Sequence, residues 1–122
     1  MSSRIEILSI PIWNVTMDET RDFVFQCIAE GKPGFIATAN AEMVMKAQTD
    51  VELARILQQA DMVIPDGAGV LWAAEQQGKK FKERVTGFDL AYRLLQEAAE
   101  KQTSVYLFGG AEGVASQAVE NC

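Results

Sequence analysis

The sequence contains no histidine, which is the side chain that most often serves as a general acid or base and as a metal ligand. Its two cysteines, Cys27 and Cys122, lie far apart and form no Cys-x-x-Cys pair. Cys27 falls on the apolar face of an expected helix, where a free cysteine behaves as a small buried hydrophobe. These absences exclude histidine-based catalysis, and they give no support to a zinc site or a dithiol redox centre.

Basic residues are also scarce. Eleven lysines and arginines stand against 17 aspartates and glutamates, so the net charge is −6 and the isoelectric point is about 4.6. The one lysine cluster, at residues 79–82, is short and is followed by an acidic residue. An acidic chain without a basic stripe is not expected to bind nucleic acid.

Long apolar runs are absent as well. No stretch approaches the roughly 20 apolar residues that a membrane-spanning helix needs. The N-terminus leads into a mixed strand pattern and not into the apolar core of a signal peptide. We therefore expect a cytoplasmic chain.

Apolar residues make up 48% of the 122 positions, which suits one small globular domain with a core. Strand patterns alternate with helix patterns, and this alternation predicts a Rossmann-like α/β fold, a mostly parallel sheet flanked by helices. The expected strands are residues 5–10, 11–15, 35–38, 62–64 and 104–108. Pro11 divides the first two, which are expected to form a hairpin or a bent edge. The expected helices are residues 16–30, a helix from 41, another from 50, then 68–77, 88–101 and 112–122. Thr16 with Glu19 fits a capping box at the start of the first helix, Gly31 and Pro33 stop it, and Asp50 is expected to cap the third.

The last expected helix stops abruptly at Cys122, soon after a strand. A doubly wound sheet rarely ends in this way. We therefore expect residues 1–122 to be a single α/β domain that is the N-terminal part of a longer one.

Asp66 stands at the centre of the most informative stretch, residues 62–70 (MVIPDGAGV). A short apolar strand runs into Pro65, two glycines permit a tight turn, and a helix follows. Asp66 has two interpretations of about equal weight. It caps the following helix, or it points into a cleft as a general base.

Polar or glycine residues follow three of the expected strands. Thr38 and Asn40 follow one, Asp66 follows the second, and Gly109-Gly110 follow the third. Because parallel strands end at the same edge of a sheet, this pattern predicts a cleft there. Thr38 and Asn40 can instead bond only to local backbone, and the two glycines fit a plain turn as well as a phosphate-binding turn.

Arg84 is a candidate phosphate clamp because its guanidinium offers a fork of donors. More often, however, an arginine forms a surface ion pair, here with the adjacent Glu83 or with another acidic residue. Trp13 and Trp72 are expected in the core, as is Phe88 on the inward face of its helix.

Four segments in this order and spacing resemble the WecG/TagA/CpsF family of bacterial glycosyltransferases. They are residues 37–42 (ATANAE), 65–69 (PDGAG), 83–89 (ERVTGFD) and 106–111 (YLFGGA). Each motif is short, but four in register over nearly the whole chain are fairly specific.

The resemblance implies an inverting glycosyltransferase that works without a metal or other cofactor. Its donor would be a UDP-sugar, either UDP-N-acetylmannosamine or its uronic acid. Its acceptor would be N-acetylglucosamine on a polyprenyl diphosphate, and the product would enter teichoic acid, common antigen or capsule synthesis. The enzyme would work on the inner face of the cell membrane, with homo-oligomerisation left open.

The resemblance makes Asp66 the catalytic base. Thr38, Asn40 and Arg84 correspond to pocket residues. The amides of Gly109 and Gly110, together with Arg84, are expected to stabilise the negative charge of the UDP leaving group. Family members continue well past residue 122, so we expect the isolated chain to be inactive. Two other hypotheses stay open, a non-catalytic nucleotide-binding module and a fragment without a function of its own.

Overall fold

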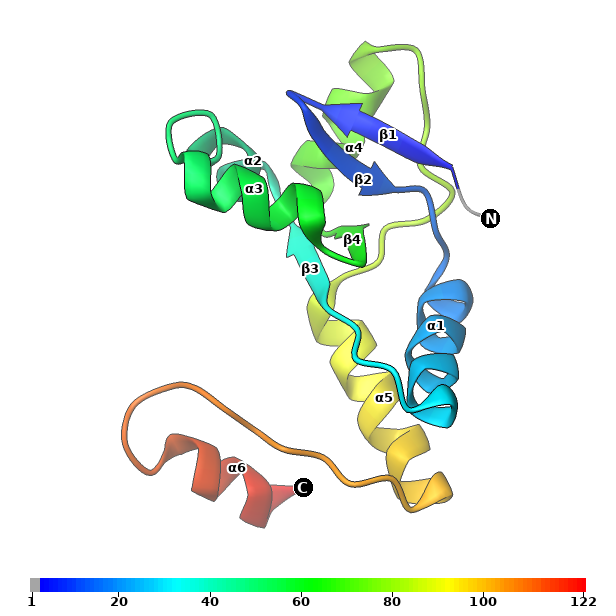
Figure 1. Ribbon diagram of the computed structural model, residues 1–122, viewed down its shortest axis with the longest axis vertical. Coiled ribbons are helices and arrows are strands. Elements are labelled where there is room, and N and C mark those ends of the chain that lie inside the picture. The colour runs from blue at the N-terminus through cyan, green and yellow to red at the C-terminus, as the bar shows by residue number, and fades with distance from the viewer. Residues whose placement is uncertain (1–2) are drawn as a thin grey trace. The chain divides into compact units, whose positions relative to one another are not determined.

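The computed structural model describes residues 3–122, which divide into two compact units, one reaching to Tyr92 and the other Arg93–Cys122. Figure 1 shows the order of the elements along the chain. The first unit holds strands β1 (Arg4–Ile7), β2 (Ile10–Trp13), β3 (Ile36–Ala39) and β4 (Met62–Pro65), helices α1 (Met17–Glu30), α2 (Ala41–Lys46), α3 (Val51–Gln59) and α4 (Ala68–Gln76), and the start of α5. The second unit holds the rest of α5 (Gly87–Lys101) and helix α6 (Val114–Asn121).

Strands β1 and β2 form an antiparallel hairpin. Its turn is Leu8-Ser9, both with positive φ (48° and 71°), the backbone that a two-residue hairpin turn requires. The prediction of two short strands in a hairpin is thus confirmed. The point of division is wrong, because the turn is at Leu8-Ser9 and Pro11 lies inside β2 opposite Glu6. A two-stranded ladder has only edge strands, where the missing N–H of proline is tolerated.

Strands β3 and β4 pair in parallel, with Thr38 opposite Ile64 and Ala39 opposite Pro65. The α/β class is thus confirmed, whereas the sheets among residues 3–122 are two separate two-stranded ones and not one mostly parallel sheet. The core fills the space between the hairpin and the parallel pair, where α3 packs on β2 and α4 packs on β1. Its most buried large members are Ile10, Ile12, Leu57, Val44, Val63 and Val70.

Local signals set the helix ends as expected. The Thr16 hydroxyl accepts the N–H of Glu19 (3.1 Å), and the Glu19 carboxylate accepts the N–H of Thr16 (2.9 Å), which completes a capping box. Gly31 ends α1 in the left-handed conformation with φ 66°. Asp50 caps α3 by accepting the N–H of Leu53 at 3.0 Å.

The expected strand at residues 104–108 is wrong. This segment is irregular, and Tyr106 and Phe108 are 85% and 91% exposed. Strand propensity measures how well a side chain fits a pleated, half-buried surface, so it needs a neighbouring strand to act on. Residues 93–122 contain no strand with which this segment could pair.

Two aromatic residues expected in the core are exposed. Phe88 is 80% exposed because it lies two positions from the buried Leu90, which places it on nearly the opposite side of α5. Trp72 is 63% exposed on α4. Trp13, by contrast, is half-buried beneath the guanidinium of Arg4, at 4.4 Å from the ring centre.

Candidate active site at the ends of the parallel strands

The carboxyl ends of β3 and β4 lie side by side, as the sequence predicted for these two strands. The N–H of Asp66 donates to the carbonyl of Ala39 at 3.0 Å, which extends the parallel ladder by one more bond. Ala37 and Ala39 are buried toward the core, so Thr38 between them faces the other side of the sheet. The chain thus brings Thr38 and Asp66 to one edge.

Asp66 does not cap the helix that follows it. The N-cap of α4 is Gly67, whose φ of 110° suits glycine, and α4 has no side-chain cap. The Asp66 carboxylate instead accepts the N–H of Gly87, the first residue of α5, at 3.3 Å. It is half-buried, and the positive end of the α5 dipole faces it.

Gly87 is the point at which these groups meet. A Cβ added there would lie 2.9 Å from Cγ2 of Thr38 and 3.5 Å from Oδ2 of Asp66. A side chain at position 87 would therefore crowd Thr38, and glycine allows α5 to approach it this closely. Thr38, Asp66 and the first N–H groups of α5 together form a small polar cluster.

Asn40 lies beside this cluster but has a local partner. Its Oδ1 accepts the N–H of Met43 at 2.8 Å and so caps α2. A Cβ on Gly67 would lie 3.7 Å from Cβ of Asn40, so the α2 and α4 starts are neighbours. The side-chain oxygen of Asn40 thus bonds only to local backbone, as one of the two sequence interpretations expected. The side-chain amide N–H groups stay available as donors.

Arg84 is carried on a loop that is tied down on both sides. The N–H of Lys82 donates to Asn14 at 2.7 Å, and the N–H of Val85 donates to the carbonyl of Pro65 at 3.1 Å. The Glu83 carboxylate accepts the N–H of Met17 at the start of α1. Arg84 itself is exposed and makes no ion pair, with Glu83 or with another acid, among residues 3–122.

Gly109 and Gly110 belong to the second unit. Both have positive φ (119° and 75°) and precede α6. The segment before this exposed turn is irregular, so the third strand end that the sequence predicted is absent from residues 93–122. Their membership of the site stays a prediction.

Sequence reasoning missed the roles of Thr86 and Gly87. The Thr86 hydroxyl accepts the N–H of Asp89 at 3.1 Å and so caps the start of α5. The spacing Thr86-x-x-Asp89 is itself a helix-start signal and could have located this end of α5. The need for glycine at position 87 has no local signal, because it arises from Thr38 across the site.

Within the described part of the chain, no three acidic or cysteine side chains gather as a metal site would require. No helix among residues 3–122 combines the length and the apolar character needed to cross a bilayer.

Comparison with known proteins gives consistent matches. The sequence model of the WecG/TagA/CpsF glycosyl transferase family matches residues 5–122. An N-acetylglucosaminyldiphosphoundecaprenol N-acetyl-beta-D-mannosaminyltransferase of Bacillus spizizenii is 34% identical over 91 residues, which are 75% of this chain and 35% of that enzyme. The enzyme of the same name from Bacillus subtilis is 27% identical over 109 residues, which are 88% of this chain and 43% of that enzyme. The matched regions thus span less than half the length of these relatives.

Proposed function

The chain belongs to the WecG/TagA/CpsF family of glycosyltransferases, and from this premise we propose that it forms the base-bearing part of a hexosyltransferase of cell-wall polymer synthesis. The donor is a UDP-linked N-acetylmannosamine or its uronic acid. The acceptor is N-acetylglucosamine on a polyprenyl diphosphate at the membrane surface. The two relatives, whose names describe such a lipid-linked acceptor, support this assignment.

One observation carries the proposal. Thr38, Asp66 and the start of α5 converge at the carboxyl ends of two adjacent parallel strands, where ligands bind in open α/β folds. This arrangement also supports a Rossmann-like fold for the domain to which the chain contributes.

The chemistry follows from an inverting displacement. Asp66 takes the proton from the attacking hydroxyl of the acceptor sugar, that oxygen bonds to the anomeric carbon, and UDP leaves from the opposite face. A single displacement inverts the configuration and needs no metal. Thr38 and the Asn40 amide orient a sugar, and Arg84 stabilises the charge on the diphosphate.

The test is Asp66→Asn in the enzyme that carries this chain. Asparagine keeps an oxygen acceptor for the N–H of Gly87, so the fold should persist, while the base is lost. We expect the rate of sugar transfer to the lipid-linked acceptor to fall by about 10²–10⁴-fold, the usual contribution of a general base.

Asp50→Asn is the matched control. Asp50 also accepts a backbone N–H at a helix start, and asparagine caps a helix about as well as aspartate. Its activity should stay at the wild-type level. A wild-type rate for Asp66→Asn would remove Asp66 from the base role. The 122-residue chain alone should show no transfer, and measurable transfer by it would contradict that expectation.

A further inference from the structure

The Asp66 carboxylate is held through one of its two oxygens. Oδ2 accepts the N–H of Gly87 at 3.3 Å, whereas Oδ1 has no hydrogen-bond partner among residues 3–122. The main chain of Asp66 is fixed separately, because its N–H donates to the carbonyl of Ala39 at 3.0 Å. The direction in which the carboxylate points therefore depends on where α5 places the N–H of Gly87.

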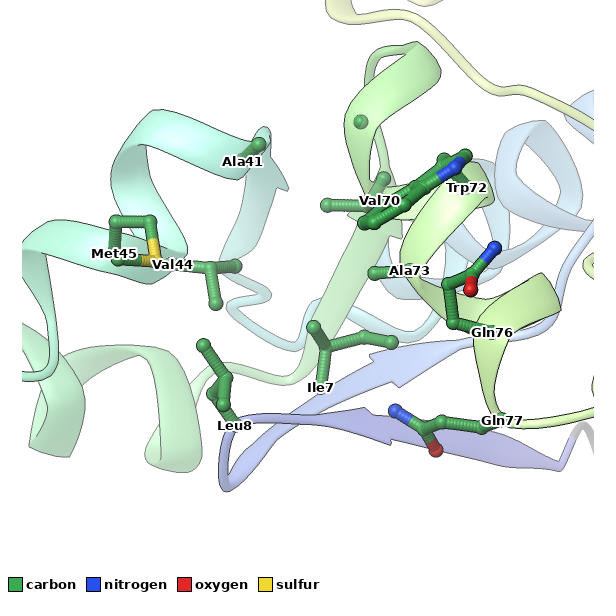
Figure 2. A pocket seen from close by; sticks show the side chains of 11 residues that line it. Ile7, Leu8, Ala41, Val44, Met45, Val70, Trp72, Ala73, Gln76 and Gln77 are labelled. Atoms are coloured by element: carbon green, nitrogen blue, oxygen red, sulfur yellow. The ribbon is translucent and has the colours of Figure 1, made fainter.

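The starts of α2 and α4 do not bond to this carboxylate. The first turn of α2 is capped by Asn40, and α4 has no side-chain cap. The two helix starts pack on each other, since a Cβ on Gly69 would lie 2.6 Å from Cβ of Ala41. Figure 2 shows the apolar groove that lies between the two helices beyond this contact, and neither Asp66 nor Gly87 lines it. Among the helix starts of residues 3–122, that of α5 alone bonds to the Asp66 side chain.

Thr86 lies between two bonds that join the end of β4 to the start of α5. On one side of it, the N–H of Val85 donates to the carbonyl of Pro65 at 3.1 Å. On the other side, the N–H of Gly87 donates to Asp66. The side chain of Val85 is fully buried, so this part of the chain is anchored in the core.

Thr86 also starts the helix. Its hydroxyl accepts the N–H of Asp89 at 3.1 Å, and its carbonyl accepts the N–H of Leu90, a buried residue, at 3.0 Å. The first N–H groups of a helix have no acceptor within the helix, so the cap satisfies one of them and leaves the N–H of Gly87 for Asp66. The cap thus fixes the direction in which the N–H of Gly87 points.

We propose that Thr86 is a positioning residue of the transfer reaction. It fixes the start of α5, whose first N–H holds Oδ2 of Asp66 and leaves Oδ1 to take the proton of the acceptor hydroxyl. This inference rests on the proposed function, in which Asp66 is the base. Loss of the cap frays the first turn of α5, and the carboxylate then loses its fixed partner. A misplacement of about 1 Å in a catalytic group costs about 10²-fold in rate.

The test is Thr86→Val in the enzyme that carries this chain. Valine has nearly the shape of threonine but lacks the oxygen that accepts the N–H of Asp89. We expect kcat to fall by about 10–10²-fold, with little change in the KM of either substrate, because the substrate contacts remain. Thr86→Ser keeps the hydroxyl and should keep a kcat close to that of the wild type.

Asp50→Ala is the matched control. It removes a bond of the same kind, from the N–H of Leu53 to the half-buried Asp50 at the start of α3, and α3 makes no bond to Asp66. Urea unfolding should show a similar loss of stability in Asp50→Ala and Thr86→Val, while kcat falls only in Thr86→Val. A wild-type kcat in Thr86→Val, or an equal loss of kcat in Asp50→Ala, would overturn the positioning role.

The double variant Asp66→Asn/Thr86→Val separates this inference from the proposed function. Because Thr86 acts through the carboxylate, Thr86→Val should lower kcat no further once Asp66 is asparagine. If Asp66→Asn is slow and the two losses multiply, the positioning role fails and the base role of Asp66 stands. If Asp66→Asn transfers sugar at the wild-type rate, the base role fails and the role of Thr86 fails with it.

Discussion

Gly87→Ala tests the closeness of α5 to Thr38. Gly87 has no positive φ, so alanine fits its backbone and restricts the unfolded chain, which alone would raise stability by about 0.4–1 kcal/mol. The new Cβ, however, would lie 2.9 Å from Cγ2 of Thr38. Overpacking of this kind costs about 1–3 kcal/mol. We therefore expect the free energy of unfolding to fall by about 0.5–2 kcal/mol.

Thr38→Ser provides the internal control because serine lacks Cγ2 and keeps the hydroxyl. Removal of one half-buried methyl group should cost less than about 0.8 kcal/mol. In the double variant the added Cβ has no close neighbour, since its next contacts would be Oδ2 of Asp66 at 3.5 Å and Cβ of Thr38 at 3.6 Å. The double variant should therefore be about 0.4–1 kcal/mol more stable than Thr38→Ser alone.

The measurement is urea unfolding followed by tryptophan fluorescence. Both tryptophans, Trp13 and Trp72, lie in the first unit together with the contact between Thr38 and Gly87. Contacting residues show interaction energies of about 0.5–3 kcal/mol in a double-mutant cycle. If the two changes are additive to within about 0.5 kcal/mol, the close approach at Gly87 is refuted.

Two further predictions concern the elements that support the site. Thr16→Ala removes one half of the capping box with Glu19 and should lower the free energy of unfolding by about 0.5–2 kcal/mol, whereas Thr16→Ser should retain most of it. Urea unfolding followed by circular dichroism measures this, and an alanine variant as stable as wild type would contradict the cap. Glu83→Ala removes the acceptor for the N–H of Met17 and should loosen the loop that carries Arg84. Steady-state kinetics of the enzyme that carries this chain should then show a higher KM for the proposed UDP-sugar donor with little change in kcat. Glu83→Gln keeps an acceptor for this N–H and should behave nearly as wild type. If both variants raise the KM equally, the effect comes from the lost charge of Glu83 and not from the lost bond that anchors the loop.

The comparison of sequence and structure separates local signals from long-range ones. The capping box at Thr16, the left-handed stop at Gly31 and the cap at Asp50 depend on residues within four positions of one another, and each lies where the sequence predicts it. The prediction of a strand at residues 104–108 is wrong because a strand forms only beside a partner strand, and the propensity of its residues does not supply that partner. The prediction that Phe88 is buried is wrong because a helix of 15 residues has several apolar positions, and only packing selects which of them are buried.

The candidate site shows the same division. That Thr38 and Asp66 follow neighbouring strands could be inferred from the order of strands and helices, since parallel strands end at one edge. Whether Asp66 caps α4 and whether Glu83 pairs with Arg84 could not be decided from sequence, because both depend on contacts with distant residues. The bond of Asp66 to Gly87 spans 21 positions, and the bond of Glu83 to Met17 spans 66.

The sequence by itself determined the α/β class, the family, most helix ends and the identity of the polar residues at the strand ends. These features follow from short-range periodicity, capping and motif spacing. Only the tertiary structure decided which helix start meets the Asp66 carboxylate and why a Cβ at position 87 would crowd Thr38. The physical reason is that each of these depends on the distance between atoms of residues far apart in the chain, which is set by packing around a common core.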